Sequence, residues 1–182
     1  MKSIILIGPL GVGKSTVGAL LAERLGRPAV SMDDLRLGYY AEIGYDRELA
    51  ARARAADGFW GMYRYWKPFE AHAVERILAD HPDCVIDFGA GHSVYEDAGL
   101  FGRVRRALAP CPRVVLLLPA PDPADALRIL AGREEGAEAM AEINRHFLEH
   151  PSNARLATHT VYTYERPPAE VCAAVLAALG LG

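Results

Sequence analysis

Residues 8–15 have the sequence GPLGVGKS and match the phosphate-loop pattern GxxxxGK[ST] at every fixed position. The stretch follows an apolar run at residues 3–7 and opens a helical pattern over residues 14–25, which is the context that this motif requires. Its glycines let backbone N–H groups converge on phosphates at a helix N-terminus, where the helix dipole also favours anions. The sequence therefore predicts a P-loop between a first strand and a first helix.

The P-loop residues have expected roles toward a bound nucleotide. The Lys14 ammonium reaches the β- and γ-phosphates, and the Ser15 hydroxyl ligates Mg²⁺. Thr16 adds a hydroxyl contact to the α-phosphate. The remaining phosphate contacts are expected from the loop residues Gly8, Gly11, Val12 and Gly13. We expect ATP as the nucleotide, because the chain has no NKxD-type motif that would read guanine.

Short apolar runs alternate with helical patterns along the rest of the chain. Strands are expected at residues 3–7, 28–31, 84–88, 113–118 and 158–163. Helical patterns lie between them and after the last one, and the longest covers residues 33–80. This alternation predicts an α/β fold with a parallel sheet and helices on both faces. No repeat or linker divides residues 1–182, so we expect one domain in which residues 33–80 form an inserted helical lobe.

Length and composition limit the classes of function. The 182 residues can enclose one hydrophobic core, and 51% apolar with 24% charged residues is an ordinary globular composition. A formal net charge of −3 argues against nucleic acid as the main partner, which usually requires a surplus of Lys and Arg. No run approaches the roughly 20 apolar residues of a membrane span. We therefore expect a cytoplasmic monomer or homodimer that acts on a small molecule, with no nucleic acid and no membrane as partner.

With this P-loop in a short chain, the sequence resembles shikimate kinase and the wider group of nucleoside-monophosphate-kinase-like P-loop kinases. The resemblance implies a three-layer P-loop kinase fold with a five-stranded parallel sheet in the order 2-3-1-4-5. It also implies an acceptor-binding lobe at about residues 33–80 and a lid at about residues 131–140. The implied activity is transfer of the γ-phosphoryl group of ATP, with Mg²⁺, to a hydroxyl group of a small molecule.

Several residues match positions of the family's motifs. The Asp-x-Asp after the family's second strand corresponds to Ser31-Met32-Asp33, so Asp33 takes the contact to the acceptor hydroxyl and Ser31 replaces an aspartate that serves Mg²⁺. The resemblance further implies an acceptor-binding glycine loop with Gly89 and Gly91. It also implies a lid arginine at Arg133 and an adenine-packing proline at Pro167 or Pro168.

Three carboxylates are candidates for the chemistry by position. Asp33 lies at the carboxyl end of a strand beside the P-loop, so we expect it to orient and deprotonate an acceptor hydroxyl. Asp34 is a second candidate for the substrate, although either residue could instead cap a helix. Asp87 ends an apolar run as a Walker-B carboxylate does, which makes it a candidate ligand of Mg²⁺. Its alternative role is to cap the turn before Gly89.

Two positions depart from the arginines that bind shikimate in the family. Lys67 replaces the first arginine and loses its bidentate grip on a carboxylate. Glu149 stands in place of the second arginine and would repel a carboxylate. We keep Lys67 as a candidate substrate contact and expect an acceptor other than shikimate.

The predicted lobe leaves further interpretations open. Most of the aromatic residues lie between Tyr39 and Phe69, which is typical of a pocket with flat apolar walls or of simple packing on the sheet. His92, after the glycine loop, could face the acceptor. The lobe arginines keep a second function open, that of a nucleotide or coenzyme-precursor kinase: Arg47, Arg52, Arg54 and Arg64. A third is a nucleotide-switch ATPase without a small-molecule acceptor.

Overall fold

Five parallel strands form the centre of the computed structural model, which describes residues 2–132 and 137–182. The strands are β1 (Ile4–Ile7), β2 (Ala29–Ser31), β3 (Val85–Asp87), β4 (Val114–Leu118) and β5 (His159–Tyr162). They pair in the order β2-β3-β1-β4-β5, and each neighbouring pair is parallel. The expected fold class and strand order are confirmed.

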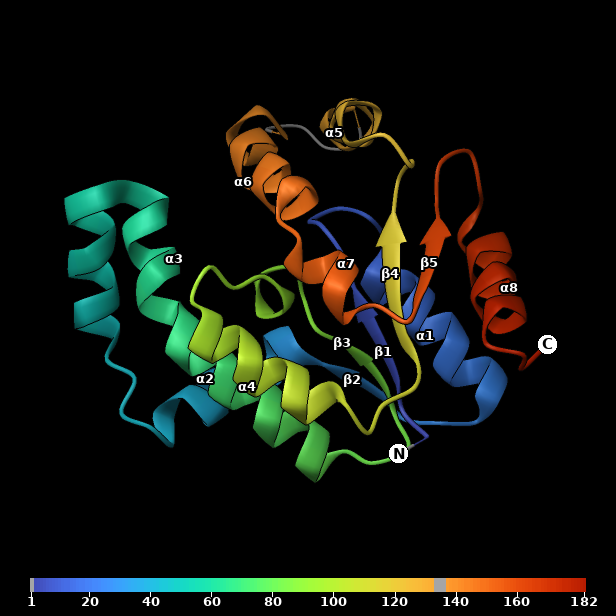
Figure 1. Cartoon of the computed structure of the whole chain (residues 1–182), viewed down its shortest axis with the longest axis horizontal. Coiled ribbons are helices and arrows are strands. Elements are labelled where there is room, and N and C mark those ends of the chain that lie inside the picture. Colours follow the sequence, from blue (N-terminus) through green and yellow to red (C-terminus); the bar gives the residue numbers. More distant parts are fainter. Residues whose placement is uncertain (1, 133–136) are drawn as a thin grey trace.

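Helices connect the strands and cover both faces of the sheet (Figure 1). They are α1 (Lys14–Leu25), α2 (Met32–Ala41), α3 (Arg47–Asp80), α4 (Ala98–Leu108), α5 (Pro123–Ala131), α6 (Ala137–Glu149), α7 (Ser152–Leu156) and α8 (Pro168–Ala178), with a 3₁₀ turn η1 (Gly91–Ser93). No helix within the described ranges is long and apolar enough to cross a membrane.

The central strand shows why the sheet needs helices on both sides. All four residues of β1 are buried, and their side chains alternate between two hydrophobic clusters. Ile5 and Ile7 pack with residues of α2, α3 and α4, whereas Ile4 and Leu6 pack with residues of α1 and α8. Because successive strand residues point to opposite faces, a continuous apolar run is stable only in a sheet covered on both sides.

The segment expected to be helical at residues 33–80 is not one uninterrupted helix. It divides into α2 and α3, and the Asp46 carboxylate begins α3 by accepting hydrogen bonds from the backbone N–H groups of Glu48 and Leu49. The backbone of α3 leaves helical geometry at Asp57 and Gly58, where Gly58 has φ 56°. Glycine accepts this left-handed conformation without the strain that a Cβ would bring.

Two short elements were not expected from the sequence, the turn η1 and helix α7. The Ser152 hydroxyl of α7 pairs with the backbone of Tyr95, donating to the Tyr95 carbonyl and accepting from the Tyr95 N–H. This contact joins residues 57 positions apart, so no local pattern could indicate it.

At Gly8 the P-loop packs closely against strand β4 of the sheet. It has φ +142°, and a Cβ at this position would lie 2.3 Å from the Leu117 carbonyl oxygen. We expect Gly8→Ala to lower the free energy of unfolding by about 2–4 kcal/mol, through backbone strain and the clash with β4. Urea denaturation measures this loss. Gly44→Ala is the control, because Gly44 also has positive φ but its Cβ would meet no atom within 4 Å. Equal losses in the two variants would contradict the proposed clash.

Candidate active site

The P-loop leaves β1 at its carboxyl end and opens α1 at Lys14. Gly11 and Gly13 have φ of 72° and 101°, and no side chain caps the N-terminus of α1. A cavity of about 400 Å³ lies over this helix end. It is lined by Leu10, Gly11, Gly13, Lys14, Ser15, Thr16, Asp33, Asp87, Gly89 and Ala90. We call it the phosphate cavity, because a helix N-terminus next to a lysine is suited to bind phosphates.

The Lys14 side chain folds back over the loop. Its ammonium donates hydrogen bonds to the Gly8 and Pro9 carbonyl oxygens at 3.0 and 2.8 Å. Burial lowers the Lys14 pKa from 10.5 to about 8, although the carboxylates of Asp87 and Asp33 act in the opposite direction. A bound triphosphate would bring negative charge to this ammonium and favour its protonated form.

Asp87 joins the P-loop to the strand beside it. One of its carboxylate oxygens accepts a hydrogen bond from the Ser15 hydroxyl at 2.6 Å, and the other accepts one from the Gly89 N–H at 2.8 Å. Asp87 therefore caps the turn before Gly89 and also lies next to Ser15, the predicted Mg²⁺ ligand. Oxygen ligands beside bound phosphates suit Mg²⁺, which usually keeps several waters. Ser15 and Asp87 fit such an ion.

Asp33 lies at the boundary between the phosphate cavity and a second cavity. It is in the first turn of α2, and its carboxylate lies against Gly89, where an added Cβ would meet the carboxylate oxygens at 3.0 and 3.2 Å. The second cavity has a volume of about 230 Å³ and shares Leu10, Asp33 and Ala90 with the first. We call it the acceptor cavity. One carboxylate therefore borders both spaces.

Aromatic and aliphatic side chains from two helices form the walls of the acceptor cavity. Phe59, Tyr63 and Trp66 come from α3. Met140, Ile143 and Phe147 come from α6, and Leu10, Arg36, Glu70, Gly91 and His92 complete the lining with Asp33 and Ala90. Four other aromatic residues of the predicted lobe form a packed group of rings, namely Tyr40, Tyr45, Tyr65 and Phe69. Both interpretations of the aromatic segment thus apply, each to a different part of it.

The structure does not bring Lys67 into the acceptor cavity. Lys67 is 5% exposed, and its ammonium donates to the Glu70 carboxylate and to the Gly91 and Val94 carbonyl oxygens. An ammonium has three N–H donors, so these contacts use all of them. Burial lowers the Lys67 pKa, opposed by Glu70. Lys67 therefore supports the wall of the cavity, and we withdraw it as a direct substrate contact.

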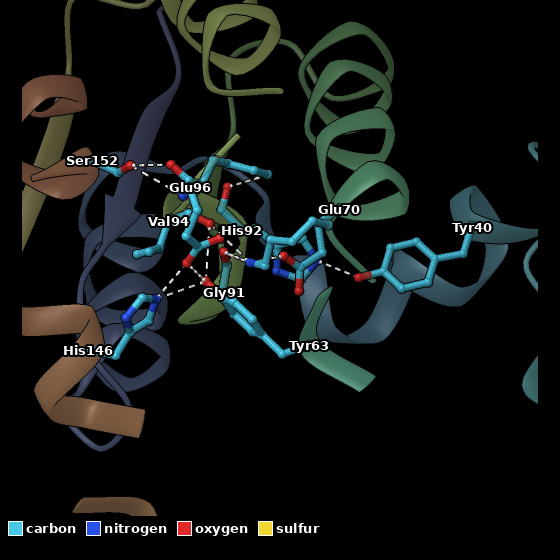
Figure 2. Close-up of polar contacts among 11 residues, drawn as sticks. Tyr40, Tyr63, Glu70, Gly91, His92, Val94, Glu96, His146 and Ser152 are labelled. Carbon is cyan, nitrogen blue, oxygen red and sulfur yellow. Dashed lines mark hydrogen bonds and ion pairs between the residues drawn. The ribbon is translucent and has the colours of Figure 1, made fainter. Parts of the chain in front are cut away.

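Figure 2 shows polar contacts on both sides of Glu70, the buried partner of Lys67. The Tyr63 hydroxyl donates to the Glu96 carboxylate at 2.9 Å, and the His146 ring of α6 lies 2.6 Å from the same oxygen. On the other side, Tyr40 Oη lies 3.1 Å from Nε2 of His92. Burial lowers the His92 pKa, which favours a neutral ring. His92 lines the cavity, as the sequence suggested, but it is buried and is not a surface histidine.

The remaining predicted site residues are dispersed. Gly89 lines the phosphate cavity and Gly91 the acceptor cavity. Asp34 lines a third cavity with Ser31, Ser15 and Asp87, and it does not line the acceptor cavity. Pro167 precedes α8 and lines neither of the two site cavities. Arg133 and residues 134–136 of the predicted lid lie outside the described residues.

Two residues at the site were missed by the sequence analysis. The Asn144 side chain accepts a hydrogen bond from the Leu10 N–H at 2.9 Å and donates one to the Leu10 carbonyl at 3.3 Å, joining α6 to the P-loop. Nothing in the sequence connects residues 134 positions apart. Arg36 lies one helical turn after Asp33, with Nε 3.6 Å from the Asp33 carboxylate. This spacing of three residues was a signal that could have been used.

Comparison with known proteins agrees with this geometry. No protein-family model matches the sequence. A shikimate kinase of Streptomyces avermitilis is 36% identical over 98% of this chain and 95% of that protein. Among solved structures, a shikimate kinase from Acinetobacter baumannii in complex with shikimate superposes with a TM-score of 0.66 at 19% identity, covering 98% of this chain and 93% of that one. A gluconokinase from Sinorhizobium meliloti reaches 0.61 at 20% identity, covering 98% and 91%.

The fold and the two adjoining cavities define a P-loop kinase of small molecules, which uses ATP. The identity of more than one third over nearly all of both chains goes further than the fold. The chain belongs to the shikimate kinase family.

Burial of Lys14 makes stability depend on pH. Between the folded pKa of about 8 and the unfolded value of 10.5, the unfolded chain binds a proton that the folded chain does not, so the free energy of unfolding rises with pH through this window. Below pH 8 the full cost of the buried ammonium is present. Without nucleotide, we expect Lys14→Met to be more stable than the native chain at pH 7 by about 1–3 kcal/mol. This advantage should disappear by pH 10.5.

Denaturant titrations at several pH values measure this difference. Lys2→Met serves as the control, because Lys2 is an exposed lysine outside the P-loop. If the stability of Lys14→Met follows the same pH dependence as that of the native chain, the lowered pKa of Lys14 is contradicted.

Proposed function

We propose that this kinase transfers the γ-phosphoryl group of ATP to a hydroxyl group of a small polyhydroxylated acceptor other than shikimate. The observation that supports the proposal is the position of Asp33, which borders the phosphate cavity and the acceptor cavity. A carboxylate at this boundary can contact an acceptor hydroxyl and face the γ-phosphate at the same time.

The reaction is an in-line displacement at phosphorus. The acceptor oxygen forms a bond to the γ-phosphorus, the bond from that phosphorus to the β,γ-bridging oxygen breaks, and ADP leaves. The hydroxyl proton passes to the Asp33 carboxylate. Lys14 and the backbone N–H groups of the P-loop stabilise the charge on the phosphate oxygens. The apolar walls from α3 and α6 exclude water, which would otherwise compete with the acceptor.

Ser15 and Asp87 would hold Mg²⁺ in this scheme, because their oxygen atoms lie together at the edge of the phosphate cavity. When bound, the ion neutralises charge on the β- and γ-phosphates. The roles of Arg133 toward the transferring phosphate and of Pro167 toward adenine stay predictions from the family resemblance.

The acceptor is the part of the function on which the family and this chain differ. Two of the three proteins named above are shikimate kinases, which makes shikimate the reference acceptor. Two residues argue against shikimate: Lys67, whose N–H donors are all used inside the protein, and Glu149, which stands in place of an arginine.

Two alternative functions were open from the sequence. A nucleotide-switch ATPase would need no acceptor cavity. A nucleotide kinase was expected to use Arg47, Arg52, Arg54 and Arg64, and none of these four lines the acceptor cavity.

Asp33→Asn tests the catalytic assignment. We expect the variant to bind ATP as the native chain does, and to lose acceptor-dependent ADP release by about 10²–10⁴-fold, the usual contribution of a general base. Coupled-enzyme assays and calorimetric ATP titration separate the two effects. Asp125→Asn, on exposed α5, is the matched control. Unchanged transfer in Asp33→Asn would overturn the role of this carboxylate.

An acceptor panel tests the substrate class. ADP release is measured with shikimate, D-gluconate, quinate, myo-inositol and a nucleoside. We expect at least one acceptor to stimulate turnover with a higher kcat/KM than shikimate. If shikimate is the best acceptor, the proposed departure from the family is wrong, and if all wells show the same basal rate, a kinase acting on such acceptors is excluded.

A further inference from the structure

The acceptor cavity contains a cation that the family resemblance did not assign. Arg36 is the only arginine or lysine among the described residues that line this cavity. His92 is the other basic side chain there, and burial lowers its pKa, which favours the neutral ring. Among the described residues of this lining, the positive charge that an acceptor would meet therefore comes from Arg36.

The Arg36 guanidinium is held in place but is not saturated by internal partners. Its carbon Cζ lies 5.2 Å from the centre of the Trp66 ring, which is within the range of a cation–π contact. Its contact to Asp33 is 3.6 Å, longer than a hydrogen bond, and Nε has no hydrogen-bond partner in the described part of the chain. Lys67, in contrast, has three close acceptors.

The surroundings of Arg36 increase its effect on a ligand. Its side chain is 28% exposed and faces a cavity with aromatic and aliphatic walls, so an ion pair formed there is screened less than one on the surface. Arginine also matches a carboxylate with two parallel hydrogen bonds, which a lysine cannot do.

We propose that Arg36 binds a carboxylate of the acceptor, and that the preferred acceptor is therefore a small hydroxy acid. This inference rests on the proposed function, whose acceptor class it narrows. Arg36 stands one turn after Asp33 on α2, so the carboxylate and the reacting hydroxyl are held from one helix at a short separation. The charge contact has moved from the position of Lys67 on α3 to Arg36 on α2.

The experiment compares acids with neutral partners of nearly the same shape. D-Gluconate is paired with D-glucitol, and shikimate with its methyl ester, each titrated into the full chain with Mg²⁺ and ADP. Trp66 lies beside the guanidinium, so tryptophan fluorescence reports binding without turnover, and calorimetry gives the Kd. We expect at least one acid to bind about 10-fold or more tightly than its partner.

Variants assign that preference to Arg36. Arg36→Gln should weaken binding of the acid by about 10–100-fold and leave binding of the neutral partner nearly unchanged, because only the acid loses a charged hydrogen bond. Arg36→Lys should retain part of the preference. Arg76→Gln is the matched control, since Arg76 also stacks on an aromatic ring and pairs with a carboxylate, but lines neither site cavity. Thermal melts establish that each variant is folded.

The outcomes separate this inference from the proposed function. Arg36-dependent binding of an acid supports the inference even if no compound stimulates ADP release, a result that would contradict the proposed function alone. Three results overturn the inference: no acid binds with a Kd below about 10 mM, Arg36→Gln weakens acid and neutral compound equally, or Arg36→Gln keeps the acid preference. Acceptor-stimulated ADP release that survives in Arg36→Gln overturns it as well, and leaves the proposed function intact.

Discussion

The hydrogen bond between the Ser15 hydroxyl and the Asp87 carboxylate joins the two halves of the site. Ser15 lies in the first turn of α1, and Asp87 ends β3, which is hydrogen-bonded to β1. The second oxygen of the same carboxylate holds the Gly89 N–H and so places the glycine loop, whose missing side chain makes room for Asp33. One buried carboxylate therefore contacts the P-loop helix and the glycine loop, and so links the proposed Mg²⁺ ligands with the residue proposed to act on the acceptor.

The parallel sheet makes this arrangement possible. Strands that run in the same direction place their carboxyl ends at one edge, so residues that follow β1, β2 and β3 meet although they are far apart in the sequence. The helices add the walls. Helix α3 provides one side of the acceptor cavity and α6 the other, and the pair of hydrogen bonds between Asn144 and Leu10 ties α6 to the P-loop. Donor and acceptor sites are thus parts of one packed unit.

Burial determines which charged side chains can take part in binding. Lys67 and Arg36 are both cations near the glycine loop, but Lys67 is enclosed and fully hydrogen-bonded, whereas the Arg36 side chain is 28% exposed and lines the acceptor cavity. A buried ammonium without partners would be costly, so Lys67 is stable only because it is occupied. The same requirement removes it from contact with the substrate. The residue type at a family position is therefore a weak guide to its role when its neighbours have changed.

The sequence by itself determined the strands to within one residue, the strand order through the family resemblance, and the pairing of the P-loop with carboxylates at strand ends. These features follow from local patterns, since periodicity, glycines and motif spacing act over short stretches of chain. Only the tertiary structure decided that Asp34 does not line the acceptor cavity, that Lys67 faces inward, and that Arg36 and α6 line the cavity. The direction in which a side chain points depends on packing against residues up to 134 positions away, and such contacts leave no pattern in one sequence.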